Sequence, residues 1–82
     1  MWTVYVIRSE VNGRLYVGMS ENLEQRIKAH NSGKVFSTKG FKPWILIHTE
    51  EFSDSLSSRK REKYLKSGYG KQWLKKKYGS EG

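Results

Sequence analysis

Three side chains with reactive or phosphate-binding chemistry lie close together in the sequence: Tyr16, Arg26 and His30. Tyr16 falls in a segment whose apolar and polar residues alternate, as they do in a strand. In the segment that follows, Leu23 and Ile27 have helical spacing, and Arg26 and His30 lie on nearly the same side of that helix. A guanidinium offers a planar fork to phosphate oxygens, and an imidazole titrates near neutral pH. Because a purely structural helix would carry Leu or Ala there, the pattern predicts a polar site at the edge of the core.

A carboxylate from a later helix, Glu62, is a further candidate. On a helical wheel for residues 55–66, Glu62 falls on the same side as Ser55 and Ser58. Since serine is small, this side can approach the sheet closely, and Glu62 would then point toward the protein. The other interpretation is a surface carboxylate that forms an i,i+4 ion pair with Lys66. The wheel alone leaves both open.

The positions of these side chains depend on the elements that carry them. Asn12-Gly13 is a hairpin turn signal, and a loop of even length places Tyr5 and Tyr16 on one face of the hairpin. Loops of two and four residues both satisfy this condition, and the longer one brings the tyrosines closer together. The continuous apolar run Trp44–His48 predicts a buried, central strand. The expected elements are strands over residues 2–8, 14–19 and 44–48 and helices over residues 22–30, 55–66 and 71–77.

Small size and strong basicity limit the function classes. The chain has 82 residues, no Cys and a net charge of +8, so disulfides and thiolate metal sites are excluded and a polyanionic partner is expected. Residues 1–78 are expected to form one domain, and residues 79–82 a disordered tail. The start has no signal-peptide pattern and no apolar run reaches membrane-spanning length, so the default is a cytoplasmic protein with no membrane contact.

The long connection over residues 31–43 is rich in basic side chains. It either follows a phosphate backbone or is simply a mobile basic loop, and the sequence leaves both interpretations open. The tryptophans at positions 2, 44 and 73 are expected in the core, because each lies in or beside an apolar run. Contacts with nucleic acid are expected from Lys34, Thr38, Lys39, Lys42 and Lys66.

An ordered set of motifs resembles the GIY-YIG nuclease family. The set comprises Thr3-Val4-Tyr5 and Tyr16-Val17-Gly18, followed by Arg26, His30 and Glu62. The chain is most similar to small single-domain bacterial members, which are themselves similar to the N-terminal nuclease domain of the excision-repair endonuclease. The resemblance runs from about Trp2 to Trp73. It also includes the segments 31–33, 38–40, 43–44 and 61–66.

The resemblance implies an α+β fold, in which helices flank a three-stranded antiparallel sheet in the order β-β-α-β-α-α. It implies hydrolysis of DNA phosphodiester bonds with a divalent metal, Mg²⁺ or Mn²⁺. By position, Tyr16 matches the tyrosine that activates the attacking water, and Tyr5 lines the same cleft. Arg26 matches the arginine that stabilises the phosphate, His30 stands where members carry His or Tyr, and Glu62 matches the metal ligand.

Three positions depart from the family pattern. Thr3 replaces the first glycine of the name motif, and Met19 stands where some members carry a lysine. An asparagine that some members carry near the C-terminus has no counterpart, because no Asn follows Asn31. Two function classes result. One is an endonuclease that acts on structured or damaged DNA (or RNA) in repair or recombination, by itself or with a protein partner that supplies specificity. The other is a non-catalytic nucleic-acid-binding domain of the same fold, and a partner-docking module is a weaker third.

Overall fold

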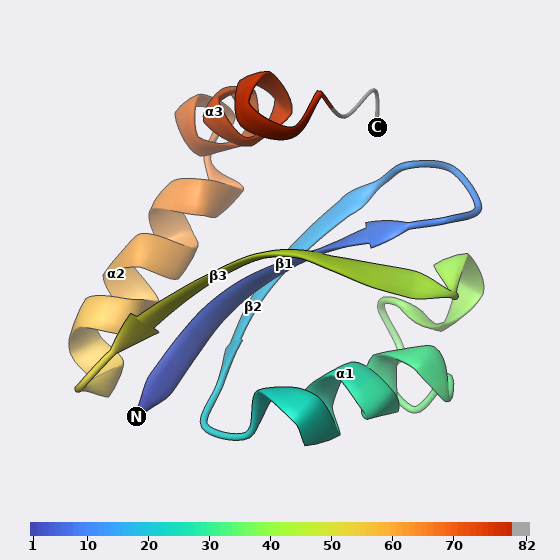
Figure 1. The fold of residues 1–82 in the computed structure, drawn as a ribbon, viewed down its shortest axis with the longest axis horizontal. Helices are drawn as coiled ribbons and strands as arrows, with labels where there is room; N and C mark the ends of the chain where they lie inside the picture. Colours follow the sequence, from blue (N-terminus) through green and yellow to red (C-terminus); the bar gives the residue numbers. More distant parts are fainter. Residues whose placement is uncertain (80–82) are drawn as a thin grey trace.

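The computed structural model describes residues 1–79 and has one three-stranded antiparallel sheet with helices on both faces (Figure 1). The α+β class and the element order β-β-α-β-α-α are therefore confirmed. Within residues 1–79, no helix is long and apolar enough to cross a membrane. The elements are β1 (Trp2–Ser9), β2 (Leu15–Ser20), α1 (Leu23–Asn31), the 3₁₀ turn η1 (Lys39–Phe41), β3 (Trp44–Phe52), α2 (Ser55–Lys66) and α3 (Gly68–Tyr78).

The central strand is β1, in the order β2-β1-β3, so the prediction that Trp44–His48 forms the central strand is wrong. In β3, Ile45 and Leu46 are 43% and 40% exposed, as at a sheet edge. The strand also extends to Phe52 and is bulged, since the pairing with β1 shifts between Val6 and Ile7. A bulge adds one residue to a strand, so apolar and polar side chains no longer alternate strictly along it. The sequence of this edge strand therefore resembles that of a strand buried on both faces.

The two faces of β1 support two separate cores. One face packs against α2 and α3, and the other against α1, which lies on the opposite side of the molecule in Figure 1. The first core contains Val4, Val6, Val17, Leu65 and Leu74. The second contains Tyr5, Ile7 and Trp44, with Tyr16, Leu23, Ile27 and Phe41 packed against them.

Helix α1 begins and ends where its sequence signals predict. The side chain of Asn22 accepts a hydrogen bond from the backbone N–H of Gln25 at 3.1 Å. In a capping box the Asn22 N–H would donate to the Gln25 side chain. Here it donates instead to Ser20 Oγ at 3.0 Å. After the helix, Gly33 has a φ of +82°, a left-handed conformation that favours glycine. These ends fix the position of the last turn, which carries His30.

Helix α2 has the predicted bounds, but α3 begins earlier than predicted. Ser67 separates the two helices and caps α3 by accepting from the Gly70 N–H, so the glycines lie in the first turn and do not break a helix. A Cβ at Gly70 would overlap the Tyr64 carbonyl, so this glycine allows α3 to contact the end of α2. Trp73, predicted in the core, is 36% exposed. The predicted tail lies largely outside the described residues. Its first residue, Gly79, is the left-handed C-cap of α3.

Candidate active site

The β1–β2 hairpin places both candidate tyrosines on one face of the sheet. Ile7 pairs with Tyr16 and Tyr5 with Gly18, so the two tyrosines are diagonal neighbours across the strands. The Ser9 N–H donates to the Arg14 carbonyl at 2.8 Å, so the turn is the four-residue alternative, over residues 10–13. The even loop and the shared face are therefore confirmed.

Gly18 makes room for the Tyr5 ring. A Cβ at Gly18 would lie 2.5 Å from the Tyr5 hydroxyl oxygen, and the Tyr5 side chain is only 1% exposed. Any side chain at position 18 would therefore displace this hydroxyl. Gly18, the last residue of the motif Tyr16-Val17-Gly18, therefore has a packing role that the motif alone does not indicate.

A chain of hydrogen bonds runs inward from the Tyr5 hydroxyl. It lies 2.8 Å from His30 Nε2, and His30 Nδ1 lies 2.8 Å from Thr38 Oγ1. Thr38 Oγ1 in turn donates to the Val35 carbonyl at 3.3 Å. Both His30 and Thr38 are fully buried. The Tyr16 ring stands edge-on to the imidazole, with 5.0 Å between ring centroids, so His30 contacts one tyrosine through a hydrogen bond and the other through its ring.

The ends of this chain fix its direction. A carbonyl can only accept, so the Thr38 hydroxyl proton points to Val35 and its oxygen accepts from His30 Nδ1–H. A neutral imidazole then carries no proton on Nε2, and Tyr5 donates to it. Burial, together with the Arg26 charge, lowers the pKa of His30 to about 4, so the ring is neutral at pH 7. His30 is therefore a hydrogen-bond acceptor that orients the Tyr5 hydroxyl.

Arg26, on α1, interacts with both Tyr5 and Tyr16. Its pKa is raised above the ordinary value, chiefly because it hydrogen-bonds to Tyr5, with Tyr16 adding to the effect. Burial raises the pKa of Tyr5, while the hydrogen bond from Arg26 opposes that rise. A shallow pocket of about 250 Å³ opens beside the guanidinium. It is lined by Ser20, Asn22, Gln25, Arg26 and Ala29. A phosphate oxygen in this pocket would lie beside Arg26.

Glu62 lies on α2, with 16% of its side chain exposed, and forms an ion pair with Lys66 at 3.4 Å. Both interpretations of this carboxylate therefore apply in part: it faces inward and it is paired along the helix. Burial is the main cause of the raised pKa of Tyr5, and the Glu62 charge adds a smaller contribution. Of the serines expected beside it, Ser58 is fully buried and Ser55 is exposed.

Comparison with known proteins identifies the family. Residues 1–78 match the GIY-YIG catalytic domain. The chain belongs to the GIY-YIG family. It is 37% identical over 73 residues to a UPF0213 protein of Staphylococcus haemolyticus, covering 88% of each chain. It is 39% identical over 64 residues to a UPF0213 protein of Clostridium perfringens, covering 77% of this chain and 68% of the relative.

A solved structure agrees with this placement. The solution NMR structure of a UPF0213 protein from Bacillus halodurans matches with a TM-score of 0.57 and 30% identity, over 96% of this chain and 87% of that one. GIY-YIG membership supports a nuclease-type function, with nucleic acid as the substrate.

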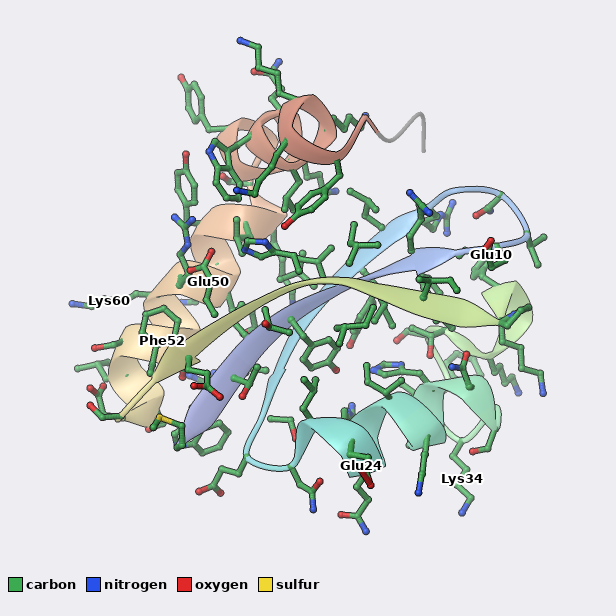
Figure 2. All side chains as sticks on the ribbon, viewed as in Figure 1. Glu10, Glu24, Lys34, Glu50, Phe52 and Lys60 are labelled. Atoms are coloured by element: carbon green, nitrogen blue, oxygen red, sulfur yellow. The ribbon has the colours of Figure 1, made fainter. Side chains whose placement is uncertain are left out.

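One predicted nucleic-acid contact of this GIY-YIG domain does not fit the structure. Thr38 is fully buried and holds His30, so its hydroxyl cannot contact a strand. Lys34, Lys39 and Lys42 are exposed on the connection after α1, and Figure 2 shows Lys34 pointing away from the sheet. Lys66 is half exposed and paired with Glu62.

One set of hydrogen bonds in this GIY-YIG domain, between the end of α1 and the start of β3, was not predicted from the sequence. The Asn31 side chain accepts from the Trp44 N–H at 2.6 Å and donates to the Trp44 carbonyl at 3.1 Å. The Trp44 indole N–H donates to the Thr38 carbonyl at 2.9 Å. These bonds hold the last turn of α1, which carries His30, against β3. The segment 31–33 was part of the family resemblance, but its spacing gave no sign of this contact.

Proposed function

We propose that this protein is a metal-dependent endonuclease that hydrolyses phosphodiester bonds of structured or damaged DNA, in repair or recombination. The main observation behind the proposal is that the Tyr5 hydroxyl donates a hydrogen bond to the buried, neutral His30 and also interacts with Arg26. A core can be built from apolar side chains alone, and buried polar groups such as these are tolerated only because each one has a hydrogen-bond partner. Phosphodiester hydrolysis needs such oriented hydroxyls and a fixed cation.

Arg26 would bind the scissile phosphate. Its guanidinium stays protonated and borders an open pocket, so two phosphate oxygens can approach it side by side. Tyr16, in the role that the family resemblance gives it, would activate the attacking water. An ordinary phenol is a poor base at neutral pH, so this role requires the phosphate and the metal ion to be bound as well.

His30 is better suited to positioning Tyr5 than to receiving its proton. The pKa of an ordinary phenol is near 10, burial raises that of Tyr5, and the pKa of His30 is about 4. Proton transfer across a difference of about six pKa units costs about 8 kcal/mol. That cost exceeds the whole benefit of general-base catalysis, which contributes about 10²–10⁴-fold, or about 3–5 kcal/mol. We therefore assign His30 as a positioning residue for Tyr5.

Glu62 would hold the metal ion. In residues 1–79 no group of three or more His, Asp or Glu side chains could form a metal cage. One carboxylate completed by waters and substrate oxygens fits Mg²⁺ or Mn²⁺ and does not fit a structural zinc site. When bound, the ion supplies Lewis-acid stabilisation of the phosphate oxygens. Lys66 competes for the same carboxylate in the absence of metal.

The test is cleavage of labelled branched, nicked and single-stranded DNAs with Mg²⁺ or Mn²⁺, and with a chelator. Glu62→Gln should abolish metal-dependent cleavage while folding and DNA binding largely survive. Glu24→Gln is the matched control, because Glu24 is an exposed carboxylate on α1 that Figure 2 shows pointing outward. Cleavage by Glu62→Gln at the wild-type rate would refute the metal assignment. Binding by the wild type without cleavage of any substrate would favour the non-catalytic binding domain.

A further inference from the structure

A groove of about 560 Å³ crosses the outer surface of α2 and α3, the helices that cover the opposite face of the sheet from α1. In Figure 1 these helices lie at the left and top, away from α1. The groove contains three aromatic rings, one amide and two lysines. Its lining residues are Tyr64, Tyr69, Gln72, Trp73, Lys75 and Lys76.

The three rings are exposed, so they do not belong to the core. Tyr64 is 43% exposed, Tyr69 80% and Trp73 36%. Tyr69 and Trp73 are four residues apart and share one side of α3, while Gly70 and Leu74 face inward and are buried. An exposed cluster of large aromatic side chains marks an interaction surface.

A polar network contacts two of the three rings, those of Tyr64 and Trp73. The Glu50 carboxylate, which Figure 2 shows between β3 and α2, accepts from Arg61 Nε at 2.8 Å and Nη2 at 3.1 Å. The Arg61 guanidinium so fixed lies 5.1 Å from the Tyr64 ring centroid and 5.3 Å from that of Trp73. The His48 ring stands edge-on to Trp73 at 5.5 Å. Rings held in this way lose little freedom when a flat ligand stacks on them.

The charge around the rings is positive. None of the six lining residues is acidic, and the Lys77 ammonium lies 5.3 Å from the Trp73 ring centroid. Protein-binding patches are enriched in Tyr and Trp but depleted in Lys, whereas single-strand binding surfaces combine aromatic rings with Lys and Arg. The composition therefore favours a nucleic-acid strand over a protein partner.

We propose that this groove binds a single-stranded nucleic-acid segment. Bases stack on Tyr69 and Trp73, and Lys75 and Lys76 contact the phosphates. None of the candidate active-site residues lines the groove, so the protein would hold an unpaired strand at a surface distinct from the one that engages a scissile phosphate. The groove can be tested whether or not the protein cleaves DNA.

The test compares binding of a fluorescent oligothymidylate of about 12 nucleotides, a length within the range that small single-strand sites occupy. Tyr69→Leu keeps apolar bulk but removes the stacking ring, and we expect the affinity to fall at least about fivefold. Leu56→Ala is the matched control, because Leu56 is a 65% exposed apolar residue on α2 outside the groove. Equal affinity of Tyr69→Leu and the wild type would overturn the proposal.

Two indole N–H resonances separate the two sites in one NMR titration. Trp73 reports on the groove, while Trp44 donates to the Thr38 carbonyl beside the candidate active site. We expect the oligothymidylate to shift the Trp73 resonance first. A Trp44 shift with an unchanged Trp73 would overturn the proposal. So would a Trp73 shift caused by protein concentration alone, since a second copy of the chain would then occupy the groove.

Discussion

Acidification should destabilise this protein through His30 at a higher pH than through Glu50. The folded structure lowers the pKa of His30 from 6.5 to about 4, because the ring is buried and lies near Arg26. The unfolded chain therefore binds a proton at a pH where the folded protein cannot. The stability that the neutral ring provides is present above pH 6.5 and is lost as the pH falls toward 4.

The size of the loss follows from the two pKa values. Relative to pH 7, we expect the free energy of unfolding to fall by about 2 kcal/mol at pH 5 and by about 3 kcal/mol near pH 4. Glu50 contributes separately and at a lower pH. Burial raises the pKa of its carboxyl, but other interactions, chiefly the hydrogen bond with Arg61, hold that pKa below its ordinary value of 4.5. Its stabilisation is lost only as the pH falls from about 4.5. The window from pH 7 to 5 therefore separates the contribution of His30 from that of Glu50.

The assay is urea unfolding at several pH values, for the wild type and for His30→Gln. The variant has no imidazole at this position, so its stability should fall by about 2 kcal/mol less between pH 7 and 5. NMR titration of the His30 Cε1 proton in the wild type checks the cause directly and does not depend on how well the variant folds. A His30 pKa at or above 6.5, or equal slopes in the two proteins, would refute the reasoning.

Three further outcomes test other parts of the structure. Gly18→Ala should cost about 1–3 kcal/mol of stability and displace the Tyr5 hydroxyl, so a variant with wild-type stability and cleavage would contradict the packing role of this glycine. Asn31→Ala should lose about 1–3 kcal/mol with its two hydrogen bonds to Trp44, measured by thermal or urea unfolding. DNA affinity should fall linearly with salt on a log–log plot, and Lys34→Ala should reduce the slope by about one; a flat wild-type plot would exclude electrostatic binding.

Local signals in the sequence were sufficient for the type and order of the elements and for the hairpin. Asn22, Gly33 and the even turn act within a few residues, so their effects follow from spacing alone. The central strand was misassigned because an apolar run does not report which neighbours pair with it. Trp73 was misassigned because only one side of α3 is buried, and Leu74 occupies that side while Trp73 does not.

The candidate site was predictable as a set of residue types but not as a geometry. The family resemblance named Tyr5 and His30 together, yet no pattern indicated that they share a hydrogen bond or that Thr38 holds the far ring nitrogen. Both contacts join residues that lie on different elements. They exist only after α1 has packed on the sheet, so they depend on tertiary structure that periodicity does not encode.

The alternation along β1 also limits how the length of this chain can change. Tyr5 faces α1 while its neighbours Val4 and Val6 face α2 and α3, and the turn over residues 10–13 sets the register of both strands. Inserting or deleting a single residue in that turn would place Tyr5 and Tyr16 on opposite faces unless a bulge absorbed the change. Insertions of two residues would keep them together. Tolerance to insertion here should therefore alternate between odd and even lengths, a pattern that a library of turn-length variants would reveal.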